Sequence, residues 1–488
     1  MEKVDFLRKK YPKFIYKNYS YEISGNPRTR ASSVRGRNLE IFFDFKIEPG
    51  IYFQPKVVIE NVDKSRLAKI GDRILDNLIF NLGLMEIPSY WKATCSPEIE
   101  VKAGPLNQEQ IKRWKNLIID GMGQFFYENK INFRKPNFLN ISIINAAGSR
   151  RDYAAGSRSD ILVPVGSGKD SVVTLETLKK AKKDIQCFSL NPTEAAERIT
   201  KIAGCRSPII VQRKIDEKLL KLNRQGFLNG HTPFSAYLAF LSVLVATIFG
   251  QKYIAFSNER SSNEGNVKYL GKIINHQWSK SFEFEQKFRN YSKKYLTSGV
   301  KYFSFLRPLY EIQIAKLFSK YPKYFNAFLS CNVAYQTASG TKLPTKKWCG
   351  KCSKCLFVFA ILYPFVGKKN PPSRKATEDK ELLKIFGKNL FKDKKLLPIM
   401  QQLTGERGFK PLECVGTKKE SLIAFYLSWK KSRDRVSTKL PFLLRHFEKK
   451  ILPKYPNIEK ESKKLLDSWN NQNNLSKEYE KILKDAVS

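Results

Sequence analysis

The chain has few histidines, few cysteines and no apolar run long enough to cross a membrane. Its one membrane-like stretch, Phe234 to Phe249, is 16 residues long between Pro233 and Gly250, whereas a spanning helix needs about 20. We therefore expect a buried core helix there. The charged segment from Met1 to Tyr11 lacks the apolar centre of a signal peptide. These absences predict a cytoplasmic protein without a membrane span.

Cysteine usage is equally sparse. Eight cysteines among 488 residues are too few for a disulfide scaffold. Four of them, Cys331, Cys349, Cys352 and Cys355, are clustered as metal ligands usually are. The pattern predicts a metal site and a reducing compartment.

Acidic residues are outnumbered: 45 stand against 88 Lys and Arg, a net charge of +43. Such an excess favours a polyanionic partner, which would be nucleic acid, an acidic membrane or a polyanionic small molecule. The excess is diffuse, however, because the segment from Gly367 to Ser488 is only slightly more basic than the average of the chain. Lysine used as the default surface residue explains this distribution, so nucleic-acid binding is disfavoured.

Residues 1–150 predict an N-terminal α+β domain. Aromatic and β-branched runs at Phe14–Tyr16, Leu39–Phe43 and Tyr52–Ile59 indicate antiparallel strands. Helical spacing of apolar residues follows at Ser65–Leu84 and Asn107–Asn129. No chemical motif is evident in this region.

Residues 158–370 predict an α/β domain, after a Gly-rich and charged linker at Gly148–Arg158. Strand patterns alternate with helix patterns here, which indicates a mostly parallel sheet with helices on both faces. The expected strands and helices are Ile161–Val165, Ile185–Leu190, Thr193–Ala203, Pro208–Val211, Phe234–Phe249 and Tyr253–Ser257. Ligands bind such sheets at the carboxyl ends of their strands. Residues 371–488 predict a basic, helical accessory region.

The loop Gly166-Ser167-Gly168-Lys169-Asp170-Ser171 lies between a predicted strand and a predicted helix. A Gly-rich turn there directs backbone N–H groups and a helix N-terminus at one point, which suits a phosphate. The Walker A pattern fails, because Val163 replaces its first Gly and Asp170 its Ser/Thr. The loop instead resembles the Ser-Gly-Gly-x-Asp-Ser loop of the adenine-nucleotide alpha-hydrolase-like ATPases, with Ser167 in place of the middle Gly. That resemblance implies cleavage of ATP between the α- and β-phosphates.

The segment Cys349-Gly350-Lys351-Cys352-Ser353-Lys354-Cys355 offers three thiolates at two-residue gaps, with Cys331 as a fourth. Four soft ligands suit tetrahedral zinc, although the spacing also permits an iron–sulfur cluster or free thiols. A similar Cys-Gly-x-Cys-x-x-Cys cluster accompanies the same kind of ATP loop in the queuosine-precursor nitrile synthases. That resemblance implies a structural Zn²⁺ site.

Polar strings follow the apolar elements between the loop and the cysteines. In chain order they are Asn223-Arg224-Gln225-Gly226, Asn229-Gly230-His231, Ser257-Asn258-Glu259-Arg260-Ser261, Asn275-His276-Gln277-Trp278-Ser279 and Leu306-Arg307-Pro308-Leu309. Together with the loop, Ser330-Cys331-Asn332 and Trp348-Cys349-Gly350, they resemble the UDP-N-acetylmuramoyl-L-alanyl-L-glutamate epimerases of peptidoglycan synthesis. The match covers Ile161 to Phe365, with fainter similarity at Phe386-Gly387-Lys388-Asn389-Leu390 and Glu413-Cys414-Val415-Gly416.

The resemblance implies that ATP and Mg²⁺ activate the terminal glutamate of UDP-MurNAc-L-Ala-L-Glu, whose Cα is inverted with release of AMP and diphosphate. Under this hypothesis Gly166, Ser167, Gly168, Lys169, Asp170 and Ser171 hold the ATP phosphates and magnesium. Candidates for proton transfer are His231, Glu259 and His276. Candidates for substrate binding are Asn223, Arg224, Asn229, Asn258, Arg260 and Arg307. The three histidines of the chain are informative because they are scarce, although a structural role for each is equally compatible with the sequence.

Two other functions are compatible with the sequence. A tRNA-modifying ATP pyrophosphatase would account for the net charge and the cysteines, and it should gather its basic residues on one face. A basic RNA-binding protein with a decayed ATP site is the non-enzymatic alternative, which the intact Lys169, Asp170 and Ser171 disfavour. The sequence does not predict an oligomeric state.

Overall fold

The computed structural model describes residues 3–25, 37–143, 158–335, 347–367, 378–434 and 439–488. The predicted linker at Gly148–Arg158 lies almost wholly outside the described residues. The strands are β1 (Lys13–Gly25), β2 (Arg37–Ile47), β3 (Ile51–Phe53), β4 (Lys56–Glu60), β5 (Glu98–Val101), β6 (Asn140–Ile143), β7 (Arg158–Pro164), β8 (Ile185–Leu190), β9 (Ile209–Lys214), β10 (Gln251–Phe256), β11 (Val267–Tyr269), β12 (Lys272–Ile274) and β13 (Lys301–Ser304).

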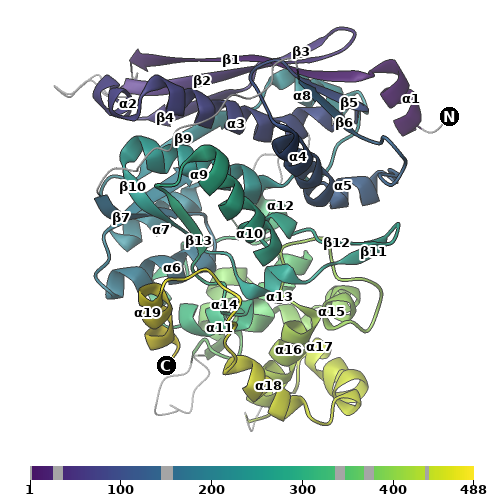
Figure 1. Cartoon of the computed structure of the whole chain (residues 1–488). Helices are drawn as coiled ribbons and strands as arrows, with labels where there is room; N and C mark the ends of the chain where they lie inside the picture. Colours follow the sequence, from purple (N-terminus) through teal and green to yellow (C-terminus); the bar gives the residue numbers. More distant parts are fainter. Residues whose placement is uncertain (1–2, 26–36, 144–157, 336–346, 368–377, 435–438) are drawn as a thin grey trace.

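The helices are found along the whole described chain. They are α1 (Lys3–Lys10), α2 (Lys64–Ile70), α3 (Asp72–Trp91), α4 (Gln108–Gly121), α5 (Gly123–Glu128), α6 (Lys169–Lys180), α7 (Glu194–Ala203), α8 (Glu217–Arg224), α9 (Phe234–Phe249), α10 (Phe282–Tyr291), α11 (Glu311–Phe318), α12 (Asn332–Tyr335), α13 (Ser353–Leu362), α14 (Glu378–Phe386), α15 (Leu397–Thr404), α16 (Lys418–Arg433), α17 (Phe442–His446), α18 (Ile458–Leu466) and α19 (Lys477–Val487). Figure 1 shows the N-terminal strands at one end and the C-terminal helices at the other.

One mixed sheet runs through the described residues, in the order β13-β10-β7-β8-β9-β4-β2-β1-β5-β6, with β3 paired to β2. Strands β13, β10, β7, β8 and β9 are mutually parallel, as the alternating pattern predicts. The N-terminal strands β1, β2 and β4 are antiparallel, also as predicted. The α/β fold class is confirmed.

The predicted boundary near residue 150 does not divide this sheet. Strand β4 pairs with β9 in antiparallel register, so the N-terminal strands extend the parallel sheet. Glu86 of α3 also holds Arg213 of β9 through two hydrogen bonds of 2.6 Å, both groups being buried. The N-terminal region therefore shares a sheet and a core with the α/β region.

Helices on both faces of the sheet follow from which side chains each strand buries. In β7, Leu162 belongs to the core shared with the N-terminal region, whereas its neighbours Ile161 and Val163 belong to the core shared with the C-terminal helices. Strand β10 divides in the same way, because Ile254 and Ala255 lie in different cores. Successive side chains of a strand point to opposite faces, so each central strand is covered on both sides.

Helix α9 is the predicted core helix. Residues from Ala236 to Ile248 are almost all buried, and its C-cap is Gly250 with φ of 81°. In the parts of the chain that the structure describes, no helix is long and apolar enough to cross a bilayer.

Cys187 of β8 and Cys205, which follows α7, form a disulfide. The prediction of a reducing compartment did not anticipate this bond. None of the four clustered cysteines takes part in a disulfide.

Candidate functional site

The loop Gly166–Ser171 joins the carboxyl end of β7 to the start of α6. Gly168 is the N-cap of α6 and provides no side-chain cap, while the N–H of Gly166 donates to Ser171 Oγ at 3.1 Å. The first N–H groups of a helix without a side-chain cap are available to an anion. The geometry of the loop therefore suits a phosphate. Phosphate binding itself stays a prediction.

Lys169 does not project freely from this loop. Its side chain is buried, and Nζ donates to Asp170 Oδ1 at 2.6 Å and to Glu311 Oε2 at 2.5 Å. Burial alone would lower the pKa of Lys169, but the two carboxylates outweigh burial and hold that pKa above its ordinary value. Lys169 is therefore a fixed positive charge at the base of the loop.

Glu311 was not predicted from the sequence. It begins α11, directly after the Leu-Arg-Pro-Leu string, and its backbone N–H donates to Ser261 Oγ at 3.0 Å. Lys354 lies 3.5 Å from its other carboxylate oxygen. Burial opposes ionisation, yet Lys169 and Lys354 lower the pKa of Glu311 to about 2. The available signal was an acidic residue at the start of an apolar helix.

Glu259 follows β10, the neighbour of β7 in the sheet, and is 2 % exposed. Its Oε1 is buried and has no hydrogen-bond partner among the described residues. Burial raises the pKa of Glu259 to about 7, although Lys280 opposes this shift. A buried, unpaired carboxyl group that titrates near neutral pH is typical of a proton-transfer residue.

His231 and His276 form a pair, with ring centroids 4.5 Å apart. Burial lowers the pKa of both rings, that of His276 to about 3, and nearby lysines contribute. Both imidazoles are therefore neutral at physiological pH. Nδ1 of His231 is buried without a hydrogen-bond partner.

The N-terminal region, in which the sequence shows no chemical motif, supplies groups to this pair. Gln124 of α5 hydrogen-bonds to His276 Nδ1 through Oε1 and donates from Nε2 to Glu128 at 2.8 Å. Lys92, at the end of α3, donates to Gly230 O at 3.0 Å. Burial lowers the pKa of Lys92 to about 8. Folding, and no local motif, brings these residues to the histidines.

Cys414 completes the arrangement from the C-terminal region. Its Sγ lies 3.4 Å from His276 Nε2 and 3.8 Å from Lys280 Nζ. Cys414 and then Glu259 outweigh burial and raise the pKa of Lys280, with smaller contributions from Asp170 and Glu311. Electrostatic interactions weaken with distance, so Lys280 lies near both the thiol of Cys414 and the loop that contains Asp170.

Arg307 does not fit its predicted role in substrate binding. The side chain is fully buried and pairs with Glu285, with Nε to Oε2 at 3.2 Å. Nη1 donates to Glu259 O at 2.6 Å and Nη2 donates to Lys280 O. No donor is left facing a ligand. Arg307 instead fixes the backbone of two charged residues of the site.

Asn258 is likewise buried, and donates to Tyr302 OH at 3.4 Å and to Ser304 Oγ at 3.2 Å, so its amide group is structural. Arg260 stacks on Tyr310 with Cζ 4.3 Å from the ring centre. The remaining substrate candidates precede His231 in the sequence. Asn223 and Arg224 lie in α8, and Asn229 lies in the loop before His231. Arg224 and Asn229 are exposed, whereas Asn223 Oδ1 is buried without a hydrogen-bond partner.

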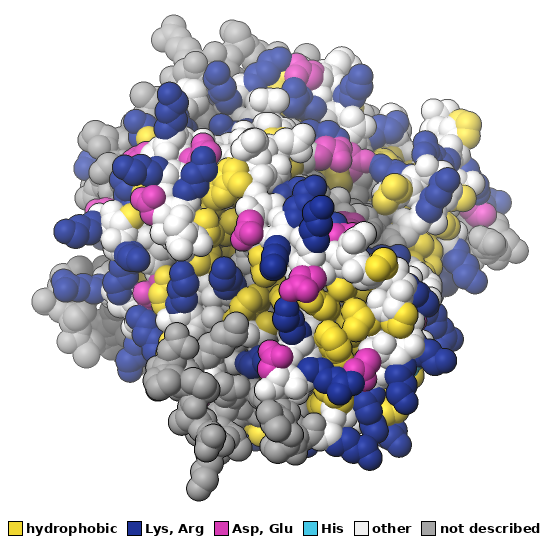
Figure 2. All heavy atoms as spheres, turned by 90° about the horizontal axis from the view of Figure 1, so that it is seen from below, with side chains coloured by type: hydrophobic (Ala, Val, Ile, Leu, Met, Phe, Trp, Pro, Cys, Tyr) yellow, Lys and Arg dark blue, Asp and Glu magenta, His cyan; other side chains and the backbone are white. Residues whose placement is uncertain are grey.

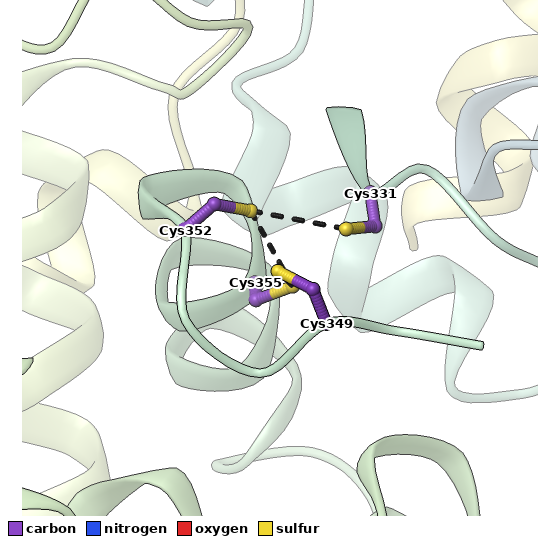
Figure 3. Close-up of side chains that lie close together, drawn as sticks. All are labelled: Cys331, Cys349, Cys352 and Cys355. Atoms are coloured by element: carbon purple, nitrogen blue, oxygen red, sulfur yellow. Dashed lines mark hydrogen bonds between the residues drawn. The ribbon is translucent and has the colours of Figure 1, made fainter. Parts of the chain in front are cut away.

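The four predicted metal ligands come together. Figure 3 shows Cys355 on α13, Cys352 at the N-cap of that helix, Cys349 on the turn before it, and Cys331 approaching from a separate segment. All four Sγ atoms lie within 4.8 Å of one another, with separations of 3.5 Å for Cys352–Cys355, 3.6 Å for Cys349–Cys355 and 3.9 Å for Cys331–Cys352. A tetrahedral zinc with bonds of about 2.3 Å requires sulfurs about 3.8 Å apart. The residues fit Zn²⁺.

The cysteine cluster is connected to the loop at two points. Leu329 N donates to Ser167 O at 2.8 Å, two residues before Cys331. Lys354, between Cys352 and Cys355, reaches Glu311 and through it Lys169. A metal in the cluster would therefore hold both the loop and its charge network in place.

We expect Cys349→Ala to abolish zinc binding and to lower the midpoint of thermal unfolding by several degrees, because three thiolates leave a tetrahedral site incomplete. Metal content by plasma mass spectrometry and unfolding by circular dichroism measure the two effects. Cys95→Ala is the matched control, since the thiol of Cys95 contacts Arg8. Wild-type protein purified without any bound metal would contradict the prediction.

The comparisons with known proteins identify the family of this chain. The MurL N-terminal domain model matches residues 28–305 and the MurL C-terminal domain model matches residues 327–451. The UDP-N-acetyl-alpha-D-muramoyl-L-alanyl-L-glutamate epimerase of Micromonospora sp. is 33% identical over 363 residues, covering 74% of this chain and 75% of its own. The enzymes of the same name from Xanthomonas oryzae pv. oryzae and Salinispora tropica are 33% and 30% identical, over 69% and 85% of this chain and 71% and 84% of their own. The chain belongs to the UDP-N-acetyl-alpha-D-muramoyl-L-alanyl-L-glutamate epimerase family.

Proposed function

We propose that this protein inverts the terminal L-Glu of UDP-MurNAc-L-Ala-L-Glu to D-Glu, using ATP and Mg²⁺ and releasing AMP and diphosphate. The observation that carries the proposal is one charged network. It connects the Gly-rich loop and Lys169 with Glu259 and, through Lys280, with Cys414 and the histidine pair. The names of the relatives supply the substrate class. A peptidoglycan-precursor enzyme of this kind works in the cytoplasm.

The chemistry explains why a phosphate-type loop and proton-transfer groups share a site. A free α-carboxylate makes its own Cα–H very weakly acidic, because the carbanion would form beside a negative charge. Joining that carboxylate to AMP removes the charge and allows an enolate to form. A side chain whose pKa lies near neutrality can then remove the proton. Hydrolysis of the acyl-adenylate makes the inversion effectively irreversible.

The proposal assigns binding of the ATP phosphates to the loop, with Lys169 as a fixed charge beneath it. The half-buried Asp170 is a carboxylate suited to Mg²⁺, which would neutralise phosphate charge there. Substrate contacts stay with Asn223, Arg224, Asn229 and Arg260, while Asn258 and Arg307 hold the site together. Glu259, His231 and His276 stay candidates for proton transfer.

A tRNA-modifying pyrophosphatase is less well supported. On the face drawn in Figure 2, Lys and Arg side chains are scattered among acidic and apolar ones and do not gather into one patch. This distribution fits a diffuse surface charge better than an RNA-binding face.

The direct test is incubation of the protein with UDP-MurNAc-L-Ala-L-Glu, ATP and Mg²⁺, followed by acid hydrolysis and chiral analysis of the glutamate. We expect D-Glu together with AMP. AMP released only on addition of tRNA, without D-Glu, would support the alternative function.

The histidine pair gives a second test. We expect His276→Gln to lower the rate of D-Glu formation by about 10²-fold, because general acid–base groups contribute about 10²–10⁴-fold. His231→Gln is expected to have a comparable or smaller effect, and His446→Gln, which alters the histidine beside Glu406, is the control. Full epimerisation rates in both His231→Gln and His276→Gln would remove the histidines from the mechanism.

A further inference from the structure

We propose that the thiol of Cys414 donates the proton that inverts the glutamate Cα, and that the hydrogen-bonded series of Glu128, Gln124 and His276 orients that thiol. This inference rests on the proposed function and assigns one of its two proton transfers. The series of contacts joins three separate parts of the chain: Gln124 of α5 contacts His276, which follows β12, and His276 contacts Cys414 in the C-terminal region.

The donor and the acceptor in each hydrogen bond of this series can be assigned, starting from Glu128. Glu128 only accepts when ionised, so Gln124 must present its NH₂ group to Glu128 and its oxygen to His276. Nδ1 of His276 is then the protonated nitrogen. In a neutral ring Nε2 is left as an acceptor, and the atom it faces at 3.4 Å is Cys414 Sγ. The resting cysteine is therefore a protonated thiol that donates to His276.

The surroundings also stabilise the thiol after it has lost its proton. Lys280 Nζ lies 3.8 Å from Sγ, so an ammonium group stands ready beside a developing thiolate. Cys414 is half-buried and not fully enclosed. The other free cysteines described by the structure differ, since four form the metal-type cluster and Cys95 is buried against Arg8.

Glu259 supplies the complementary base. Its Oε1 has no hydrogen-bond partner, and its carboxyl group interacts with the same Lys280 that contacts Cys414. Arg307 fixes both positions, because its guanidinium donates to the carbonyl oxygens of Glu259 and Lys280. Arg307 thus fixes the backbone of Glu259, the proposed base, relative to that of Lys280, which stands beside the proposed acid Cys414.

The proton steps balance. The ionised carboxylate of Glu259 takes the α-proton, the Cα–H bond breaks, and its electron pair enters the enolate of the acyl-adenylate. The enolate then forms a new Cα–H bond with the proton of Cys414, and the S–H electron pair stays on sulfur as a thiolate beside Lys280. Water hydrolyses the adenylate. Glu259 finally releases its proton to solvent, and the thiolate of the half-buried Cys414 regains one from solvent.

A deuterium experiment distinguishes this assignment from a structural role. UDP-MurNAc-L-Ala-L-Glu, ATP and Mg²⁺ are incubated in D₂O with wild-type, Cys414→Ala or Cys414→Ser protein, and AMP, D-Glu and α-deuterium in L-Glu are measured. We expect both variants to release AMP at near wild-type rates and to form D-Glu at least about 10²-fold more slowly. Because Glu259 still removes and returns the proton on one face, they should place deuterium in L-Glu without inversion.

Several outcomes would overturn the assignment. D-Glu formation at the wild-type rate in either variant removes Cys414 from the proton transfer. If the variants still release AMP but no longer place deuterium in L-Glu, Cys414 is the base that removes the α-proton and not the acid proposed here. Loss of AMP release in both variants makes it a binding or structural residue. Cys95→Ala is the control and should behave as wild type. Wild-type protein that forms neither AMP nor D-Glu refutes the proposed function itself.

Discussion

Replacing Lys169 with methionine is expected to lower AMP release by about 10²–10³-fold, the usual cost of removing one preorganised charge or donor from a developing anion. Lys169 is buried at the start of α6, with its ammonium group fixed by Asp170 and Glu311. Methionine keeps the length of the side chain and removes the charge. Formation of AMP and of D-Glu should therefore fall together, measured in the same reaction.

The buried ion pair complicates this variant in a predictable way. Removing Lys169 leaves Glu311 with Lys354 as its remaining ion-pair partner among the described residues, and is expected to destabilise the fold by about 3–5 kcal/mol. The double variant Lys169→Met with Glu311→Gln neutralises that charge, and should regain stability without regaining activity. Lys179→Met is the matched control, because Lys179 lies in the same helix and binds the backbone of Ala203. Wild-type AMP release in the double variant would refute the role of the loop.

The second large effect is expected for Glu259→Gln. The amide cannot take the α-proton, so D-Glu formation should fall by about 10²–10⁴-fold, and deuterium should no longer enter L-Glu in D₂O. AMP release should persist, because Glu259 makes no hydrogen bond to Lys169 or the loop. Asp216→Asn is a suitable control, since that carboxylate caps α8. Deuterium exchange at the wild-type rate in Glu259→Gln would exclude Glu259 as the base.

The same variant predicts a change in stability with pH. The pKa of Glu259 is raised from an ordinary value of 4.5 to about 7 in the folded protein. Between these values the folded state binds more protons than the unfolded state, so this group makes the free energy of unfolding decrease as pH rises. The limit is about 1.4 kcal/mol per pH unit for one proton. Glu259→Gln should therefore gain stability relative to wild type from pH 4.5 to 7, measured by urea denaturation. A constant difference across that range would contradict the raised pKa.

Much of the fold was readable in the sequence because local signals and tertiary packing agree there. The strand Ile185–Leu190 and the helix Phe234–Phe249 were predicted with the bounds that β8 and α9 have. Three cysteines at two-residue gaps must lie close together, and the structure brings Cys331 to them. The central sheet crosses the predicted boundary near residue 150, because β4 pairs with β9. Strand pairing between β4 and β9 leaves no local trace in either strand.

The site was predicted only where its residues belong to strings. Glu259, His231 and His276 were found because they follow apolar elements in recognisable order. Glu311, Lys354, Gln124 and Lys280 were missed, since each is an ordinary residue locally and gains its role from a partner distant in sequence. The partners of Arg307 are hidden from the sequence for the same reason. An arginine inside a polar string looks like a ligand contact until its buried partner Glu285 is placed against it.

The central claim is that the α-carboxylate of the substrate glutamate is joined to AMP before its Cα is inverted. It can be tested with UDP-MurNAc-L-Ala-L-Glu carrying oxygen-18 in that carboxylate alone. Attack of the carboxylate on the α-phosphorus of ATP, followed by hydrolysis at the acyl carbon, leaves one labelled oxygen on the phosphate. We predict AMP that carries one oxygen-18 atom for each D-Glu formed, as measured by mass spectrometry. D-Glu formed together with unlabelled AMP, or without any AMP, would contradict the account.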